Sequence, residues 1–202
     1  NTAKRLSLSF NGLSADWYWM RSLQYVGRKV LSLPEGAMLD RLGSANLKLL
    51  PALLDTATSL DPQFIEPYEY GAIVLPVSDV DAAIRLTKKG IAANPSSWRL
   101  YHHLGYIYWQ RGELATAAET YGAGGQIPGA PEWMTAMKAK MLADGGGRAT
   151  AREIYSRMYE DSTDEKVKDM AQRRLLQLDA FDQIDTLENV LEAVKTRLRR
   201  CP

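Results

Sequence analysis

Two adjacent histidines, His102 and His103, are the only imidazoles in the chain and the first side chains to test for chemistry. Neighbouring residues on a helix point about 100° apart, so the two rings cannot hold one metal ion from a single face. A two-histidine metal site on a helix needs i, i+4 spacing instead. We therefore expect neither a metal centre nor a catalytic histidine at this pair.

Other residue types that carry chemistry are also poorly placed. The run 144–147 (Asp-Gly-Gly-Gly) is not followed by Gly-Lys-Ser/Thr, so it predicts a turn and not a phosphate loop. No serine stands in a Gly-x-Ser-x-Gly elbow. The acidic pairs 160–161 and 164–165 fall in an expected solvated connection. These patterns predict a protein that is not an enzyme, has no cofactor and takes no small-molecule substrate.

The net charge of +1 does not favour nucleic acid, and basic residues are too sparse among the aromatics of 98–109 for base stacking. The basic residues at the C-terminal end are expected to be a solvated helix end, where cations suit the helix dipole; they are Lys195, Arg197, Arg199 and Arg200. The single cysteine, Cys201, excludes an intramolecular disulfide. It leaves open a disulfide to a partner or a free thiol, and does not decide the compartment.

No apolar run approaches the roughly 20 residues that span a bilayer. The sequence begins with Asn1 and not with Met, which is consistent with a removed leader or with residues upstream. A signal or anchor before Asn1 therefore stays open.

A period of 33 to 34 residues organises the middle of the chain. Such a period is the signature of a helical-hairpin repeat. The recurring residues are Pro62, Pro95 and Pro128; Gly71 and Gly105; Ala83, Ala117 and Ala151; and Thr87, Tyr121 and Tyr155.

The clearest unit covers residues 96–129 and resembles the tetratricopeptide repeat. Its pattern of large, Leu-Gly, Tyr, Ala, aromatic and Pro residues is Tyr101, Leu104, Gly105, Tyr108, Ala117, Tyr121 and Pro128. Small residues at Gly105 and Ala117 would let two antiparallel helices approach closely, with Arg111-Gly112 as the turn between them. Tyr121 would fill the wedge between this hairpin and the next.

The flanking segments fit less closely. The repeat over 62–95 has Pro67 in an expected first helical turn and an expected capping box of Ser78 with Asp81. Residues 130–161 form a degenerate repeat that loses the Leu-Gly pair. Residues 1–61 predict an irregular helix pair with a long connection at 31–43.

The C-terminal part, 162–202, predicts two capping helices, 164–179 and 182–199. The second carries an apolar stripe of Leu187, Leu191, Val194 and Leu198. The expected fold is all-α: one continuous domain over 1–202, a tetratricopeptide-like right-handed α-solenoid of antiparallel helix pairs with flanking and capping helices.

The resemblance implies a concave groove that binds a partner segment. Carried onto this sequence, the partner-binding positions are Tyr68, Arg99, His102, Tyr106, Trp109, Trp133 and Lys140, with Ile65, Ala72, Leu75, Gln110 and Ala136 beside them. His102 should face the groove and His103 its flank. The Lys and Asn of chaperone-binding members are absent from the equivalent positions, so capture of a terminal carboxylate is not expected.

The resemblance therefore implies a non-enzymatic scaffold or adaptor for a protein or peptide partner. The alternative is a structural subunit of a membrane-associated multiprotein complex, with Trp17, Tyr18 and Trp19 at an interface. The N-terminal segment is similar to bacterial repeat proteins that are often associated with the cell envelope. This similarity favours a periplasmic or membrane-associated location over the cytoplasm, without deciding it.

Overall fold

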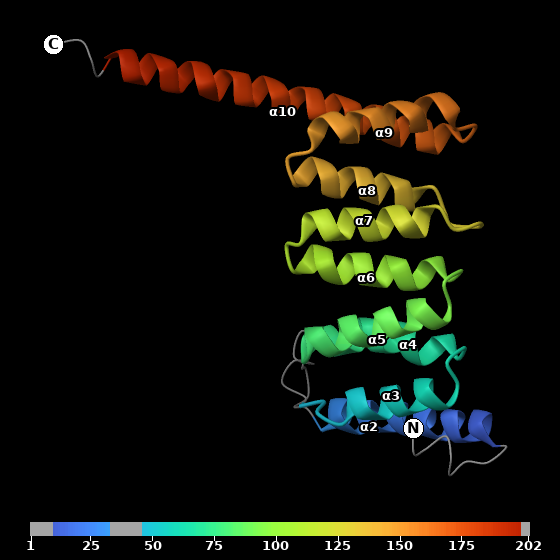
Figure 1. The fold of residues 1–202 in the computed structure, drawn as a ribbon. Coiled ribbons are helices and arrows are strands. Elements are labelled where there is room, and N and C mark those ends of the chain that lie inside the picture. The colour runs from blue at the N-terminus through green and yellow to red at the C-terminus, as the bar shows by residue number, and fades with distance from the viewer. Residues whose placement is uncertain (1–9, 33–45, 199–202) are drawn as a thin grey trace. The chain divides into compact units, whose positions relative to one another are not determined.

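The computed structural model describes residues 10–32 and 46–198, and over these residues it is built from helices without a strand (Figure 1). The expected all-α class is confirmed. The helices are α2 (Asn11–Leu31), α3 (Leu50–Leu60), α4 (Ile65–Val74), the 3-10 turn η2 (Leu75–Val77), α5 (Val80–Ala93), α6 (Trp98–Gln110), α7 (Leu114–Gly125), α8 (Trp133–Asp144), α9 (Arg148–Asp161) and α10 (Glu165–Leu198). Most of the expected 31–43 connection, together with Arg199, Arg200 and Cys201, lies outside the described residues.

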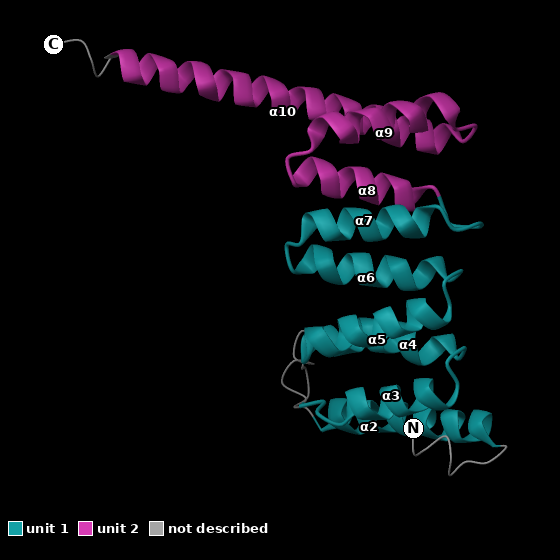
Figure 2. Cartoon of the chain, viewed as in Figure 1, with its two compact units in different colours: residues 1–131 teal, residues 132–202 magenta. Residues whose placement is uncertain are grey.

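The backbone divides into two compact units, residues 1–131 and 132–202, which we describe separately (Figure 2). The first unit contains α2 to α7 and the second contains α8 to α10. The single continuous domain expected over 1–202 stays a prediction.

The α6–α7 hairpin has the small and large residues where the repeat pattern places them. Gly112, with φ of 75°, provides the expected turn, because glycine adopts this left-handed conformation without strain. A Cβ atom on Gly105 would lie 2.8 Å from Cε2 of Tyr121, so only glycine leaves room for this ring. Tyr121 and Ala117 are fully buried. The closest contact of the hairpin, between Gly105 and Tyr121, therefore joins two residues of the tetratricopeptide-like pattern.

The α4–α5 hairpin also packs an aromatic ring on a glycine, but here the ring belongs to the first helix and the glycine to the second. Its aromatic residue is Tyr68 of the first helix, and a Cβ on Gly90 of the second would lie 2.8 Å from Cγ of that ring. Thr87, 34 residues before Tyr121, is smaller, and its hydroxyl donates to the carbonyl of Ala83 at 2.8 Å. Tyr68 is fully buried, and its hydroxyl lies within hydrogen-bond distance of the carbonyls of Thr58 at 3.4 Å and Pro62 at 3.3 Å. This corrects the expectation that Tyr68 lines an open groove.

Pro67 lies in the first turn of α4, as predicted. The start of α5 differs from the prediction, because Asp79 and not Ser78 is its N-cap residue. The Oδ1 atom of Asp79 accepts a hydrogen bond from the backbone N–H of Ala82 at 2.8 Å, which satisfies one free donor of the first turn. Asp81 is thereby left to bond elsewhere.

The N-terminal helix pair, α2 and α3, joins the core of the first unit through aromatic contacts. The Trp19 ring lies 5.2 Å from that of Tyr70 and 6.1 Å from that of Phe64, both edge-on. On the α3 side, Lys89 of α5 reaches Oδ1 of Asp55 at 2.6 Å and also donates to Thr58 at 3.0 Å. These contacts hold the irregular pair against the first repeat.

In the second unit, α8 and α9 form the degenerate hairpin, with Tyr155 buried and its hydroxyl donating to the carbonyl of Ala136 at 3.2 Å. The two helices expected at the C-terminal end are one helix, α10. Ala180 and Phe181, between the predicted ends, are not helix breakers, so the helix continues through them. The first half of α10 packs on α9, but its second half runs past α9 and is exposed, so it does not act as the expected cap (Figure 2).

The close contact at Gly105 gives a test of the packing. We expect Gly105→Ala to lower the free energy of unfolding by about 1 kcal/mol or more, because overpacking costs ~1–3 kcal/mol and the gain in helix propensity is at most ~1 kcal/mol. Gly27 in α2 is the control, since a Cβ there meets no atom within 4 Å. Gly27→Ala should raise stability by about 0.5–1 kcal/mol. Urea unfolding followed by circular dichroism measures both, and equal shifts in the two variants would contradict this account.

Candidate functional site

The first unit contains a hollow of about 650 Å³ between the end of α4 and the last turns of α6, which we name the α4–α6 groove. One wall comes from α4, η2 and the start of α5, and the other comes from α6 and its C-cap residue. The lining residues are Ala72, Ile73, Pro76, Val77, Val80, His102, His103, Tyr106, Ile107, Gln110 and Arg111.

The groove exists because α4 ends earlier than its repeat partner α6. A shift of 34 residues aligns Pro76 with Gln110, the last residue of α6. Proline has no N–H to donate and clashes with an α-helical turn, so α4 stops at Val74 and the chain tightens into η2. The last turns of α6 therefore have no full-length helix beside them.

Apolar side chains form the exposed edge of the groove. Ile73 is 62% exposed, Val77 is 43% exposed and Tyr106 is 46% exposed. Below them, Ala72 and Ile107 are buried and close the floor. Exposed apolar residues that gather around a hollow are typical of a docking surface, and tyrosine is among the residues enriched at binding hot spots.

Hydrogen bonds hold the polar rim in place. The side-chain amide of Gln110 donates to the hydroxyl of Tyr106 at 3.0 Å, and the Tyr106 ring meets that of Trp109 edge-on at 5.5 Å. Arg111 bonds to Asp81 at 2.8 Å and to Glu113 at 2.6 Å, and the hydrogen bond that it donates to Asp81 is the main reason that the pKa of Arg111 is raised. These exposed ion pairs add little stability but orient the guanidinium.

Both histidines are neutral near pH 7. Burial, followed by the neighbouring His102 and Arg99, lowers the pKa of His103 to about 4. Burial also lowers the pKa of His102. A neutral imidazole carries one donor and one acceptor, so the pair brings hydrogen-bonding groups without charge to the groove wall. The expectation placed His103 on the flank, and the structure places both rings along the hollow.

The other predicted site residues lie elsewhere. Arg99 is exposed and stacks over the ring of Trp98 at 5.2 Å, and neither Arg99 nor Trp109, whose ring meets that of Tyr106, belongs to the groove lining. Trp133 and Lys140 belong to the second unit, where Lys140 pairs with Asp144.

Sequence reasoning missed the apolar wall of the groove and the fixed arginine at its end. Pro76 was the available signal, because a proline at the aligned end of a repeat helix predicts a shortened helix. Ile73 and Val77 on either side of it then become exposed, as does one face of Arg111.

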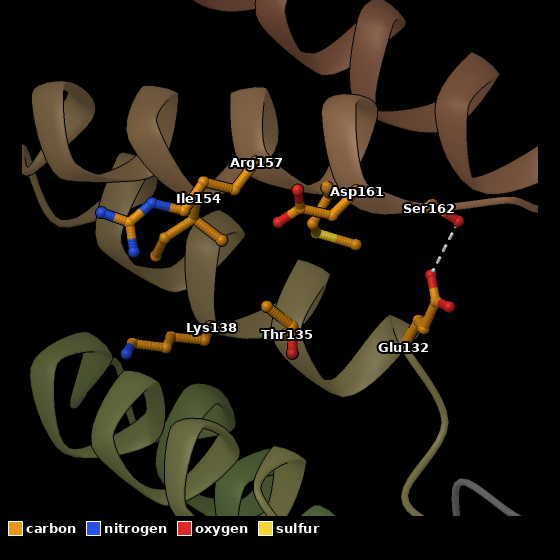
Figure 3. Close-up of a pocket in the computed structure, with 8 residues that line it drawn as sticks. Glu132, Thr135, Lys138, Ile154, Arg157, Asp161 and Ser162 are labelled. Carbon is orange, nitrogen blue, oxygen red and sulfur yellow. Dashed lines mark hydrogen bonds between the residues drawn. The ribbon is translucent and has the colours of Figure 1, made fainter.

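The second unit has a smaller hollow of about 380 Å³ between α8 and α9 (Figure 3). Its lining mixes charges of both signs, with Lys138 and Arg157 toward one end and Glu132 and Asp161 toward the other. Ser162 donates to Glu132 at 3.2 Å. The lining has no aromatic anchor, so this hollow is a weaker docking site than the α4–α6 groove.

Among the described residues, no group of three or more His, Cys, Asp or Glu side chains could hold a metal ion. None of the described helices has the length and apolarity needed to cross a membrane. The chemistry that the groove itself offers is contact with apolar side chains and hydrogen bonding through neutral groups.

No protein-family profile and no curated protein matches the sequence. The chain is similar to the solved structure of "MamA MSR-1 C2", with 16% sequence identity and a TM-score of 0.44 over 80% of this chain and 98% of that chain. A likeness at this level carries no conclusion about fold or partners, and both rest instead on the contacts within the chain.

The lowered pKa of His103 predicts a pH-dependent loss of stability. The unfolded ring takes up its proton near pH 6.5 and the folded ring near pH 4, so between these values the unfolded state binds more protons and stability falls as the pH falls. We expect His103 to account for about 2 kcal/mol of this loss.

Unfolding of the native chain and of His103→Gln, measured from pH 7 to pH 4, tests this contribution. The variant should lose less stability over that range, and the shared contribution of carboxylates cancels in the difference. Parallel pH curves for the two proteins would count against a buried neutral ring.

Proposed function

We propose that the chain is a member of the tetratricopeptide repeat family that acts as a non-enzymatic scaffold, and that it docks a segment of a protein partner in the α4–α6 groove. The observation that carries the proposal is the exposed apolar edge of Ile73, Val77 and Tyr106 around a hollow of about 650 Å³. Concave sites that are mostly apolar, with a few placed polar groups, are typical binding sites.

The lining indicates the chemistry of the segment. An apolar side chain of the partner would sit against Ile73 and Val77 and be covered by the ring of Tyr106. The neutral ring of His103 can bond to a backbone amide without selecting a charge. The groove therefore fits an uncharged stretch with one or two bulky apolar residues.

A terminal carboxylate is not the expected ligand. The cation in the groove lining, Arg111, already bonds to Asp81 and Glu113. A carboxylate would have to compete with both acidic groups for the same guanidinium. This agrees with the absence of the clamp residues of chaperone-binding members from this sequence.

The alternative function, a structural subunit of a membrane-associated complex, has support from α2. An apolar stripe on its exposed side has spacings of three and four residues; it is formed by Phe10, Leu13, Trp17 and Met20. The guanidinium of Arg21 lies 5.1 Å from the Trp17 ring. Trp19 does not belong to this stripe, because it is partly buried and packs against the core. The α2 stripe would give such a subunit a second contact face.

Binding experiments with matched variants separate the two functions. Partners captured from extracts of the native host by the tagged chain would be identified by mass spectrometry, purified and titrated by calorimetry. The groove variant is Ile73→Ala with Tyr106→Ala, the stripe variant is Leu13→Ala with Trp17→Ala, and the control is the exposed Tyr159→Ala of α9.

We expect the groove variant to bind at least about tenfold more weakly, since hot-spot residues each contribute more than about 1 kcal/mol. The control should bind like the native chain. Loss of binding in the stripe variant alone would favour the assembly subunit. Unchanged binding in both variants would reject the groove and the stripe alike.

A further inference from the structure

The second half of α10 has an apolar stripe that nothing in the second unit covers. Ile184, Leu187, Leu191 and Val194 are each at least 49% exposed. Their spacings of three, four and three residues are those of the a and d positions of a coiled-coil heptad, with Ile184 and Leu191 at a and Leu187 and Val194 at d. Ala180 continues the pattern toward the N-terminus at d.

Ion pairs show which side of α10 faces α9. Arg152 of α9 bonds to Asp179 at 2.6 Å and to Asp182 at 2.9 Å, and Arg148 bonds to Asp182 at 3.2 Å and to Asp185. The acidic face of α10 is thereby held against α9.

The apolar stripe lies on the opposite side of the helix. Leu191 follows Asp182 by nine residues, which is about two and a half helical turns, so its side chain points away from α9. The hydrophobic contacts of α10 with α9 come from a different face, where Ala171 and Leu178 are buried. The stripe is therefore not a displaced part of the core of this unit.

The charge of this half of the helix argues against a membrane surface as its partner. The second half of α10, residues 182–198, contains four acidic and two basic side chains, and two of the acidic ones, Asp182 and Asp185, pair with Arg148 of α9. Helices that lie on membranes have a basic polar face that anionic lipids attract. The remaining charged side chains, Glu188, Glu192, Lys195 and Arg197, have no net charge, so this half of the helix has no basic face of that kind.

We propose that a second copy of this chain covers the stripe, and that the two α10 helices form a parallel two-stranded coiled coil. In a parallel pair each g residue faces the e residue five positions later on the partner helix. The apolar Leu176 then meets Phe181, Gln183 meets Glu188, and the remaining pair combines Val190 with the aliphatic stem of Lys195. No two like charges face each other.

The antiparallel arrangement lacks this complementarity. The register that aligns Leu187 with Leu191 of the other copy places e residues opposite e residues. Glu188 would then face Glu188 of the second chain, and like charges in contact destabilise a pair. Among registers that pair the whole stripe from Ala180 to Leu198, the flanking residues therefore favour the parallel pair. The proposal concerns α10 alone and does not depend on the function of the α4–α6 groove.

Mass measurement tests the pairing. Light scattering after gel filtration of the full chain at about 50 µM should give twice the 22.6 kDa chain mass. Leu187→Glu with Leu191→Glu should give the mass of one chain. The matched control, Asn189→Glu with Thr196→Glu, adds the same charge at f positions on the opposite side and should keep the double mass. Because all four side chains are exposed, the variants should fold, which circular dichroism checks.

Crosslinking tests the orientation. In a chain with Cys201→Ser, a cysteine placed by Ala180→Cys lies beside its counterpart in the parallel pair and should form a disulfide. In the antiparallel register the two thiols lie about 27 Å apart and cannot react. Asn189→Cys, on the outer face, is the control and should stay reduced.

Three results would overturn the proposal. A native chain that is monomeric at about 50 µM excludes the coiled coil. A double mass that survives the two leucine substitutions moves the contact to another surface. A pair that forms without the crosslink at position 180 excludes the parallel arrangement.

Discussion

The structure depends on one packing constraint, the placement of an aromatic ring against a residue that has almost no side chain. In α6–α7 the ring of Tyr121 lies on Gly105, and in α4–α5 the ring of Tyr68 lies on Gly90. Each contact sets how closely two helices approach and how they are rotated about their axes. That rotation decides which α6 residues are left for the groove, so Tyr106 is exposed because Gly105 beside it faces the interior.

The sequence pattern predicts the α6–α7 hairpin, in which the glycine lies on the first helix and the tyrosine on the second. It fails for the α4–α5 hairpin, in which the tyrosine lies on the first helix and the glycine on the second. The period of 33 to 34 residues located α6, α7, the turn at Gly112 and the small Gly105 at the approach of the two helices, but it did not predict that the ring of Tyr121 lies on Gly105. It could not place Tyr68, since comparison of single positions assigns a residue to a surface without considering the space around it. Tyr68 of α4 is buried where its ring lies on Gly90 of α5, a dependence between two positions on different helices.

In the candidate site too, residues that depend on one helix alone were predicted, and residues that depend on a second helix were missed. His102 and Tyr106 follow from the helical period, because a period identifies the faces of a helix. The opposite wall follows from where α4 stops, and this depends on Pro76 in a different helix. The α10 helix shows a related error. The sequence pattern predicts one helix that ends at Asp179 and another that begins at Asp182, whereas in the structure both carboxylates pair with Arg152 of α9 and the helix continues between them.

The proposed groove and the proposed coiled coil are built from different residues, so they can act together. Association through α10 would give one assembly with two copies of the α4–α6 groove. A partner with two docking segments would then bind the second groove in an intramolecular step, at an effective concentration set by the span between the sites. A groove that holds only one or two apolar side chains binds weakly by itself. Pairing of chains would raise the avidity without any new contact in the groove, which gives the exposed stripe of α10 a role in binding although it touches no partner segment.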